Sequence, residues 1–402
     1  MKPAAAVIAA LEAAGGQARY VGGCVRNTLL GAEVGDIDIA TTLTPEATTK
    51  ALEAAGIKAV PTGVDHGTVT AVLDGAPYEV TTLRRDVETD GRRAVVAFTT
   101  DWAEDAQRRD FTLNAVYADG EGNLTDPTGE GVADAKARRI VFVGDAATRI
   151  AEDSLRILRF FRFQAWYGKG EPDAEALAAC TAGKDLLSNL AAERVAKELW
   201  KLLAAYDPRA VVALMGQAGV LAKLLPAAQD LSNFNRLIEI ETEQLFTCDP
   251  LLRLATLLPQ DQIGIGKAAE ALRLSNEQKD RLVQAMGRTP RITSWMSPRE
   301  SRRAVYAIGV GALSDRIKLA WAASERSATT HQWRGLLALA ESWTPPPFPL
   351  SGEDVLNSGV PKGPMVGQVL REVEEWWIDH DFIDDKFSAI EKLKAVAQGM
   401  AY

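Results

Sequence analysis

Cysteine and histidine are scarce in this 402-residue chain, with three residues of each. Cys24, Cys180 and Cys248 form no Cys-x-x-Cys pair and no even set, so the sequence favours reduced thiols over a disulfide framework. The histidines are too few and too dispersed to build a zinc site. Any bound metal would therefore have oxygen ligands, as magnesium does.

Long apolar stretches are also missing, because no run reaches about eighteen residues, the length that a membrane-spanning helix needs. Met1-Lys2-Pro3 is followed by alanines, without the apolar core and cleavage site of a secretory signal. We therefore expect a cytoplasmic protein that does not enter the membrane. The chain is too long for one compact core, which predicts two or three domains.

The net charge of −9 argues at first against nucleic-acid binding, but the charge is unevenly distributed. Residues 136–162 contain seven Lys/Arg against three Asp/Glu, and residues 271–334 contain twelve against five. Residues 335–402 contain five against eleven. Because electrostatic contacts are local at physiological salt, such basic regions can bind phosphate backbones; basic residues spread around solvated helices are an equally good interpretation of charge alone.

The first 140 residues have the pattern of a mixed α/β domain. Strands are predicted at Ala18–Val21, Ile37–Ala40, Thr68–Leu73, Tyr78–Leu83 and Phe111–Tyr117, and helices at 3–14, Val25–Leu30 and 45–56. Asp74-Gly75 predicts a hairpin turn. Arg84–Thr100 is charged and is expected to form a mobile loop with a short strand at Ala94–Phe98. From about residue 145 the periodicity is helical, with a break at 343–347.

The densest set of candidate functional residues lies near the N-terminus. Gly22 and Gly23 separate a predicted strand from a helix, so backbone amides there can approach an anion closely. Arg26, one turn into that helix, can grip a phosphate with its guanidinium group. Asp36 and Asp38 are two residues apart on a predicted strand, so both carboxylates leave one face and suit a magnesium ion shared with nucleotide phosphates.

Each half of this set has an ordinary structural interpretation. A Gly-Gly pair is usually a turn, and Asp-x-Asp at a strand end is often solvated; their order and closeness favour function. A second motif contains Arg109 and Asp110, which can contact phosphate or ribose or can form a surface ion pair of little energetic value. Taken alone, this second motif favours the ion pair.

A third motif places Asp153, Arg156, Arg159 and Arg162 at intervals of three residues, along one face of a predicted helix. An ordinary helix with i,i+3 ion pairs is one interpretation. However, three arginines beside one acid repel each other unless an anion lies alongside. The pattern therefore favours a ligand-facing surface.

In this order and spacing, the motifs resemble the class II tRNA nucleotidyltransferases, which are CCA-adding enzymes, and their relatives the bacterial poly(A) polymerases. The resemblance is specific over about residues 15–200. It includes H-G-T-V at 66–69, E-V-T-T-L-R at 79–84, D-G-R at 90–92 and E-R-V at 193–195. One position departs from it, because Asn27 stands where the family usually has aspartate.

The resemblance implies an α+β fold, with a polymerase-β-like nucleotidyltransferase head built on a mixed sheet, followed by an all-α neck, body and tail. The expected ranges are 1–143 for the catalytic head, 144–205 for the base-recognising neck, and 206–340 and 341–402 for a tRNA-binding body and tail. The implied activity adds C, C and A to the 3′ end of tRNA from CTP and ATP. It needs Mg²⁺ but no nucleic-acid template, and it releases pyrophosphate.

The resemblance also implies roles for individual residues. Asp36 and Asp38 would hold Mg²⁺, and Glu79 would be a third catalytic carboxylate on a neighbouring strand. The implied nucleotide-binding residues are Gly23, Arg26, Arg109, Asp110, Asp153, Arg156, Arg159 and Arg162. Asp153 and Arg156 would read the base, because an acceptor beside a donor matches cytosine and adenine but not uracil or guanine. The segment Arg84–Thr100 is the candidate for the change from C to A addition.

Two alternative functions stay open at this point. A poly(A) polymerase would use the same chemistry with looser primer choice, and a non-catalytic tRNA-binding protein would carry an inactive head. The segments around His66 and Asp90 favour CCA addition, and the intact aspartate pair argues against an inactive head. In the basic region, Trp295, Trp321 and Trp333 fit either RNA contact or helix packing, and packing is the expectation.

Overall fold

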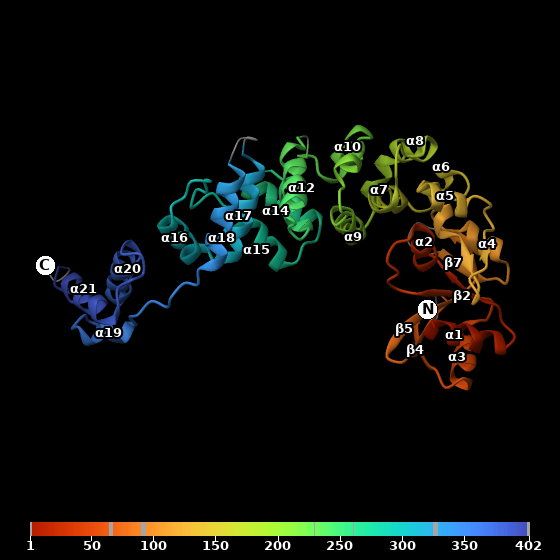
Figure 1. Ribbon diagram of the computed structural model, residues 1–402, viewed down its shortest axis with the longest axis horizontal. Coiled ribbons are helices and arrows are strands. Elements are labelled where there is room, and N and C mark those ends of the chain that lie inside the picture. Colours follow the sequence, from red (N-terminus) through yellow and green to blue (C-terminus); the bar gives the residue numbers. More distant parts are fainter. Residues whose placement is uncertain are drawn as a thin grey trace. The chain divides into compact units, whose positions relative to one another are not determined.

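The computed structural model describes residues 2–63, 67–89, 94–228, 230–259, 261–324 and 329–399. The chain divides into two compact units. The first comprises Met1–Gln229 and Glu270–Arg273, and the second comprises Asp230–Ala269 and Leu274–Tyr402. All the described strands belong to the first unit, and every described element after β9 is helical, as the sequence predicts (Figure 1).

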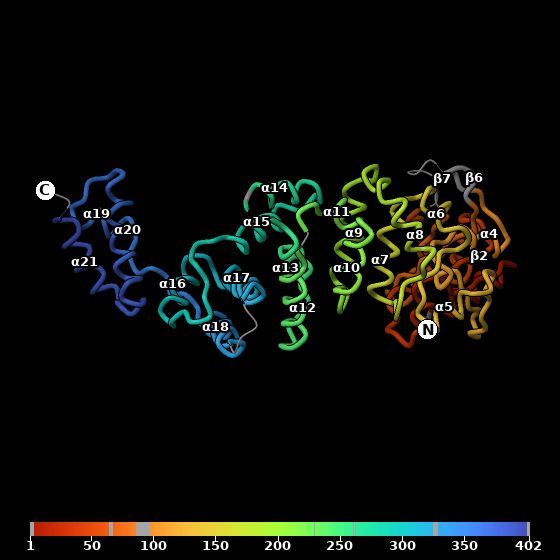
Figure 2. The backbone as a smooth tube through the Cα atoms, turned by 90° about the horizontal axis from the view of Figure 1, so that it is seen from above, coloured from red at the N-terminus to blue at the C-terminus, as the bar shows by residue number. Residues whose placement is uncertain are grey.

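The strands of the first unit form a seven-stranded mixed sheet and a separate two-stranded ribbon. The strands are β1 (Ala18–Val21), β2 (Asp38–Thr41), β3 (Lys58–Gly63), β4 (Thr68–Leu73), β5 (Ala76–Thr82), β6 (Arg84–Thr89), β7 (Ala94–Phe98), β8 (Tyr117–Ala118) and β9 (Leu124–Thr125). The order in the sheet is β3-β4-β5-β2-β1-β8-β9. β2 and β5 are parallel, whereas the neighbouring pairs are antiparallel. Helix α4, orange in Figure 2, contacts β6 of the ribbon.

The helices of the first unit surround this sheet and continue beyond it. They are α1 (Lys2–Ala13), α2 (Gly23–Leu30), α3 (Pro45–Ala54), α4 (Trp102–Gln107), η2 (Thr112–Asn114), α5 (Gly131–Ala137), α6 (Ala146–Glu152), α7 (Leu155–Tyr167), α8 (Ala174–Ala182), η3 (Lys184–Asn189), α9 (Ala192–Leu203), α10 (Arg209–Gln217) and α11 (Val220–Leu224). Helix α3 begins at the predicted position, with Pro45 in its first turn. The Thr44 hydroxyl caps it by accepting a hydrogen bond from the Ala47 amide.

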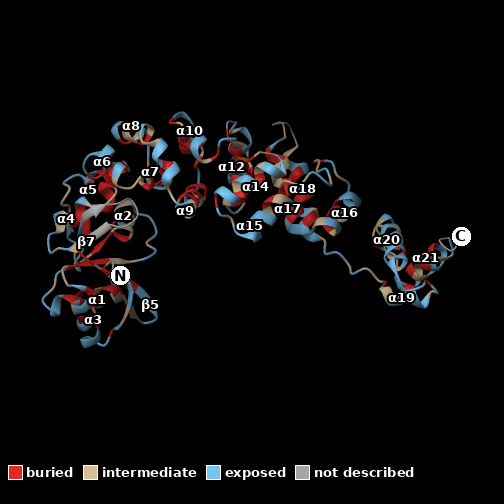
Figure 3. Ribbon diagram, turned by 180° about the vertical axis from the view of Figure 1, so that it is seen from behind, coloured by how far each residue is buried: buried red, intermediate tan, exposed pale blue. Residues whose placement is uncertain are grey.

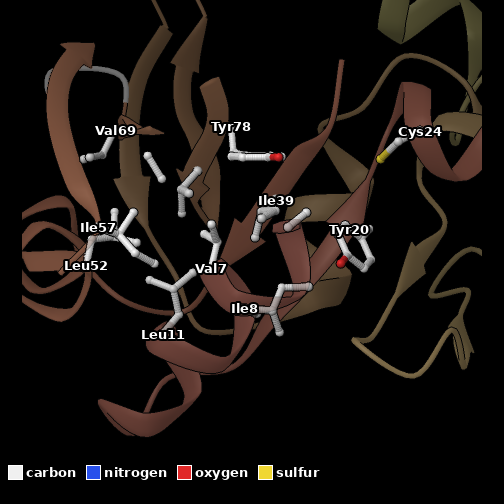
Figure 4. Packing of buried hydrophobic residues seen from close by; sticks show 14 of the residues in the cluster. Val7, Ile8, Leu11, Tyr20, Cys24, Ile39, Leu52, Ile57, Val69 and Tyr78 are labelled. Carbon is white, nitrogen blue, oxygen red and sulfur yellow. The ribbon is translucent and has the colours of Figure 1, made fainter. Parts of the chain in front are cut away.

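Alternation along the strands gives the sheet two buried faces. Tyr20 and Ile39 lie in the core beneath α1 and α3, with Leu11 and Leu52 (Figure 4). Their chain neighbours in β1 and β2 enter a second cluster on the opposite face, which contains Val21, Ala40, Leu83, Ala106 and Tyr117. Asp38 precedes Ile39 and therefore projects from the face opposite α1 and α3. That face leads to the candidate functional site.

Two local predictions for the first unit are wrong. Phe111–Tyr117 is not a continuous strand, because Thr112–Asn114 form a short 3₁₀ turn and only Tyr117–Ala118 pair in the sheet. The Asp110 carboxylate stabilises that turn by accepting hydrogen bonds from the Phe111 amide and the Asn114 side chain. Likewise, Arg84–Thr89 forms a strand with Ala94–Phe98 where a loop with one short strand is expected. Asp90, Gly91 and Arg92 lie outside the described residues, as does His66.

In the described ranges, the regular elements of the second unit are all helices: α12 (Ser232–Gln244), α13 (Pro250–Ala255), α14 (Gln262–Ala271, whose last two residues belong to the first unit), α15 (Asn276–Ala285), α16 (Pro298–Ile308), α17 (Val310–Ala322), α18 (Thr330–Ser342), α19 (Gly352–Asn357), α20 (Pro364–Asp379) and α21 (Lys386–Gly399). Buried residues follow the inner sides of α17 and α18 (Figure 3). None of the helices in the described ranges is both long and apolar enough to cross a membrane.

The tryptophans of the basic region differ in their burial. Trp321 and Trp333 are only 2% and 4% exposed and belong to the core of the second unit, as packing predicts. Trp295 is 75% exposed, so packing does not explain it. Several arginines of this region pair with acids of the last segment, for example Arg302 with Asp381. Part of its positive charge is therefore compensated within the protein.

Candidate active site

The Gly22-Gly23 turn connects β1 to α2 and requires glycine at its first position. Gly22 has φ 71° and ψ −126°, a conformation that is strained for any residue with a Cβ atom. A Cβ atom there would lie 3.6 Å from Oδ2 of Asp38. The turn therefore lies against that carboxylate, and Gly23 begins α2 with its amide at the helix N-terminus.

Asp38 and Glu79 face each other across the parallel pair β2 and β5, where they are register partners. Asp38 is half-buried and Glu79 is exposed. Burial raises the pKa of Asp38, and the negative charge of Glu79 raises it further. Asp36 lies in a bend before β2, which begins at Asp38, and is exposed. The predicted strand therefore starts later than expected, although Asp36 also contributes to the raised pKa of Asp38.

Arg26 is buried at 7% exposure, and three neutral side chains hold its guanidinium group. Nη1 donates to Asn114 Oδ1 (2.8 Å) and Nη2 donates to the Tyr167 hydroxyl (2.9 Å). Nε and Nη2 both donate to Asn27 Oδ1 (3.1 and 2.9 Å). Asn27 thus orients Arg26 although it is not an aspartate. Burial lowers the pKa of Arg26. The hydrogen-bond partners of its guanidinium group are all uncharged.

Arg109 is bound within the protein beside the carboxylates of the sheet. Its guanidinium group pairs with Asp105 at 2.9 Å and donates to the Tyr117 hydroxyl at 3.2 Å. Burial acts in the opposite direction, but the charges of Arg109 and Arg108 lower the pKa of Asp105 to about 2. The charge of Arg109 also lowers the pKa of Asp38 in part, so the two groups are electrostatically coupled. The sequence analysis assigns no role to Asp105. Its position four residues before Arg109 is the spacing of an ion pair on one helix face and could have indicated this contact.

Asp110 links the 3₁₀ turn to the helix α7. Its Oδ2 atom accepts a hydrogen bond from Arg159 Nε at 2.8 Å, and its Oδ1 atom accepts one from the Asn114 side chain. Since Asn114 also accepts a hydrogen bond from Arg26, these four residues connect α2 with α7. Although burial acts in the opposite direction, the charge of Arg159 lowers the pKa of Asp110.

Asp153 and Arg156 do not pair with each other in this structure. Asp153 caps the end of α6 and pairs with Arg194 of α9 at 2.7 Å. Arg156 pairs with Glu152 at 2.5 Å and donates to the Arg149 carbonyl at 2.7 Å. Both residues lie at the junction of α6 and α7, and the polar groups that each would offer to a base already bind backbone and side-chain groups of the protein.

The remaining arginines of α7 also have acidic partners. Arg159 pairs with Asp110, and Arg162 pairs with Glu198 of α9 at 2.5 Å. Anionic groups therefore lie alongside the three arginines, as the sequence requires, but they are carboxylates of α6, α9 and the segment before η2. Their mutual repulsion does not by itself call for a ligand. The nucleotide-binding roles of these arginines stay predictions.

Magnesium is the metal whose ligand preferences fit these carboxylates. Within the part of the chain that the structure describes, no group of three or more His, Cys, Asp or Glu side chains could hold a metal ion by itself. Magnesium at phosphoryl-transfer sites is usually bound by one or two carboxylates together with substrate phosphates and water. Two carboxylates close in sequence, one of them against a glycine turn, are of the kind that such a site uses. A cation would also offset the repulsion that raises the pKa of Asp38.

Two family models match parts of the chain. Residues 18–141 match the family described as "Poly A polymerase head domain", and residues 171–231 match "Probable RNA and SrmB- binding site of polymerase A". The first match includes the Gly22-Gly23 turn, both aspartates and Glu79.

Relatives match over most of the chain. The mitochondrial CCA tRNA nucleotidyltransferase 1 of Mus musculus is 36% identical over 367 residues, covering 89% of this chain and 82% of the mouse protein. The CCA-adding enzyme of Levilactobacillus brevis is 32% identical, covering 92% and 91%. The crystal structure of the Bacillus stearothermophilus CCA-adding enzyme with CTP has a TM-score of 0.80 and 25% identity, covering 100% and 98%. The expected fold, a mixed-sheet head followed by helices, is thereby confirmed.

Proposed function

The chain belongs to the family of CCA tRNA nucleotidyltransferases, and we propose that its catalytic centre lies where the Gly22-Gly23 turn meets strands β2 and β5. The enzyme adds C, C and A to the 3′ end of tRNA from CTP and ATP and releases pyrophosphate, without a nucleic-acid template. Register pairing of Asp38 with Glu79, next to a glycine turn, carries the assignment of the centre.

In this proposal Asp36 and Asp38 hold Mg²⁺, with Glu79 as the adjacent carboxylate. The metal held by these residues would supply Lewis-acid chemistry, lowering the pKa of the tRNA 3′-hydroxyl and offsetting charge on the pyrophosphate leaving group. The chain contributes the positions of the oxygen ligands. Ile39, buried in the sheet core, fixes the strand on which Asp38 projects.

The triphosphate is held beside these carboxylates by Gly23 and Arg26. The backbone amide at the start of α2 offers a hydrogen bond and a favourable helix dipole to a phosphate oxygen. Arg26 offers an incompletely compensated charge on a guanidinium group that three neutral partners keep oriented. Arg109 adds positive potential near Asp38 while it stays paired with Asp105. These groups bind and orient CTP and ATP alike, because the triphosphate is common to both.

Asp153 and Arg156 select the base by exchanging their present partners for it. Cytosine presents an amino donor and a ring acceptor, and adenine presents the same pair after a small shift. Uracil and guanine present a ring donor where Arg156 also donates, which leaves unpaired polar groups at a cost of a few kcal/mol. Glu152 and Arg194 hold the two side chains in the structure described here. Arg159 and Arg162 extend the same helix face toward phosphates of the nucleotide or primer.

The change from C to A addition requires a movable element, and the segment Arg84–Thr100 with its ribbon β6–β7 is our candidate. The ribbon is a sheet separate from the seven-stranded one. The Arg84 amide donates to the Asp105 carboxylate of α4, and Arg85 pairs with Glu104 of the same helix. Shortening the segment should spare C addition and abolish the terminal A. Products that still end in A at the wild-type rate would contradict this role.

For the rest of the chain we propose a catalytic head at 1–143, a neck at 144–205 that reads the base, and a body at 206–340 and tail at 341–402 that bind tRNA. Exposed Trp295, in a basic stretch of the body, supports RNA contact there. We also propose a reducing, cytoplasmic location, which the three free cysteines support. Thiol-specific labelling of protein taken directly from cells would test that location, since disulfide-linked cysteines would not react.

Product analysis tests the function directly. The protein is incubated with Mg²⁺, all four nucleoside triphosphates and a tRNA that lacks its 3′ CCA, and the products are sequenced. Extension should stop after C, C and A. A long run of A would indicate a poly(A) polymerase. No extension, with tRNA binding that Asp36→Ala leaves unchanged, would indicate a non-catalytic binding protein. The named relatives favour the first outcome.

A further inference from the structure

The side chain of Asn27 uses both ends of its amide to connect two parts of the active site. Oδ1 accepts hydrogen bonds from Nε and Nη2 of Arg26 at 3.1 and 2.9 Å. Nδ2 donates to the backbone carbonyl of Glu33 at 2.7 Å. Glu33 lies in the segment between α2 and β2, three residues before Asp36. One half-buried side chain thus touches the phosphate-binding arginine and the backbone that leads to the metal-binding aspartate.

The partners of Asn27 fix which end of the amide is oxygen. Arginine can only donate and a backbone carbonyl can only accept, so the opposite orientation would leave both contacts repulsive. An aspartate could accept from Arg26, but it has no hydrogen to donate and would place an oxygen against the Glu33 carbonyl. An alanine would lose both contacts. Among residues of this length, asparagine alone satisfies both neighbours.

Asn27 is also uncharged, so it orients Arg26 without neutralising the guanidinium charge. Its two companions at the Arg26 guanidinium group, Asn114 and Tyr167, are also uncharged. Among the ion pairs of the described residues, none involves Arg26, whereas Arg156, Arg159 and Arg162 each pair with a carboxylate. The Arg26 charge is therefore oriented without being neutralised, and a bound phosphate would not have to displace a carboxylate from it.

We propose that Asn27 is a positioning residue that holds Arg26 for the triphosphate and, through the Glu33 carbonyl, ties the phosphate site to the segment carrying Asp36. This inference rests on the proposed function of the same site. The two ends of the Asn27 amide have different effects. The acceptor, Oδ1, governs phosphate binding, and the donor, Nδ2, governs how strongly phosphate binding and metal binding reinforce each other.

Binding of CTP and of inorganic tripolyphosphate, measured by calorimetry without metal and then with Mg²⁺, tests the acceptor end. Asn27→Ala should weaken both ligands by the same factor, about ten-fold, which is the scale of a lost hydrogen bond to a charged group. Binding of cytidine, which has no phosphate, should not change. Asn189→Ala, at an exposed position at the end of η3, is the control for truncating an asparagine.

Asn27→Asp tests the donor end, because it keeps an acceptor for Arg26 and loses the donor to Glu33. The gain in CTP affinity on adding Mg²⁺ should fall at least three-fold below the wild-type gain, while Asn189→Asp retains it. An Asn27→Asp protein with the wild-type gain would overturn the link to Asp36. Wild-type tripolyphosphate binding by Asn27→Ala would overturn the positioning of Arg26. If the wild-type protein binds CTP and extends tRNA, either result removes this inference and leaves the proposed function intact.

Discussion

Two neighbouring regions of the first unit compensate their charges in different ways. Around the Gly22-Gly23 turn, Arg26 has neutral partners and the pKa of Asp38 is raised by burial and by Glu79. In the cluster of Asp105 and Arg109, by contrast, opposite charges pair directly and the pKa of Asp105 falls to about 2. A buried charge without an opposite charge beside it lowers the stability of the folded protein. Such charges are therefore expected at sites where a bound ligand supplies the opposite charge. In the proposed function, triphosphate and metal supply this charge in the first region, and the second region supports it.

Helix α7 and its surroundings resemble the compensated region, although the proposed base-reading residues lie there. Arg156 and Asp153 already have partners in Glu152 and Arg194. A base must therefore replace existing ion pairs, whereas a triphosphate at Arg26 replaces none. This difference suits the reaction, because the triphosphate site must accept both nucleotides and the base site must respond to which one is required.

The largest expected effect comes from removing the charge of Asp38 while keeping its shape. Asp38→Asn should lower the rate of C addition by about 100-fold to 1,000-fold, the scale for loss of one preorganised electrostatic group. Its free energy of unfolding should not fall, because the ionised carboxylate is disfavoured in the folded protein. Single-turnover extension of tRNA and urea unfolding measure the two quantities.

Asp280→Asn, an exposed change on α15, is the matched control and should alter neither rate nor stability. If the Asp38→Asn protein is active but less stable than wild type, Asp38 stabilises the fold as Asp105 does and has no catalytic role. The contrast between the two regions would then be lost.

Arg156→Ala should change the choice of base and not the binding of phosphate. Discrimination of CTP against UTP, measured as the ratio of kcat/KM values, should fall by about 100-fold, because the donor that rejects the uracil N3–H is gone. Tripolyphosphate affinity should stay within about two-fold of wild type, since Arg26 and Gly23 are unchanged. Equal weakening of CTP, UTP and tripolyphosphate would show instead that Arg156 contacts phosphate.

Asp105→Asn should destabilise the fold, in contrast to Asp38→Asn. Its carboxylate is 1% exposed, and its pKa lies at about 2 instead of 3.8, which corresponds to about 2 kcal/mol at neutral pH. Because the folded-state pKa is the lower one, this stabilisation is present above pH 4 and is lost as the pH falls from about 4 to 2. The stability difference between wild type and variant, measured by urea unfolding, should shrink over that range. A difference that is constant with pH would mean that the charge of Asp105 is not its source.

Local sequence patterns correctly predicted those parts of the fold that depend on residues next to each other in the chain. The Gly-Gly turn, the strand Thr68–Leu73 and the start of helix α3 depend on a few adjacent residues, and each is found as predicted or within a residue or two. The prediction of a strand at Phe111–Tyr117 was wrong, because it considered only the β propensity of these residues. The hydrogen bonds that the Asp110 side chain accepts stabilise a turn there instead.

Partners distant in sequence could not be predicted from local patterns. Arg26 meets Tyr167 and Asn114 only after the chain has folded α7 and η2 against α2. Similarly, the partner of Asp153 is Arg194, which is 41 positions away. The sequence therefore identified which residues carry charge, and only the fold shows which charges are compensated.

The smallest expected effect extends the comparison to the tryptophans of the second unit. Trp321 and Trp333 are buried, whereas Trp295 is 75% exposed and is free to stack on a base. Trp295→Ala should raise the KM for tRNA by about five-fold, which corresponds to about 1 kcal/mol of stacking, and should leave the KM for CTP unchanged. Ile263→Ala removes a similarly exposed apolar side chain without a ring and should have no effect. If both variants bind tRNA like wild type, Trp295 does not contact RNA, because removing a side chain that stacks on a base would weaken the complex with tRNA.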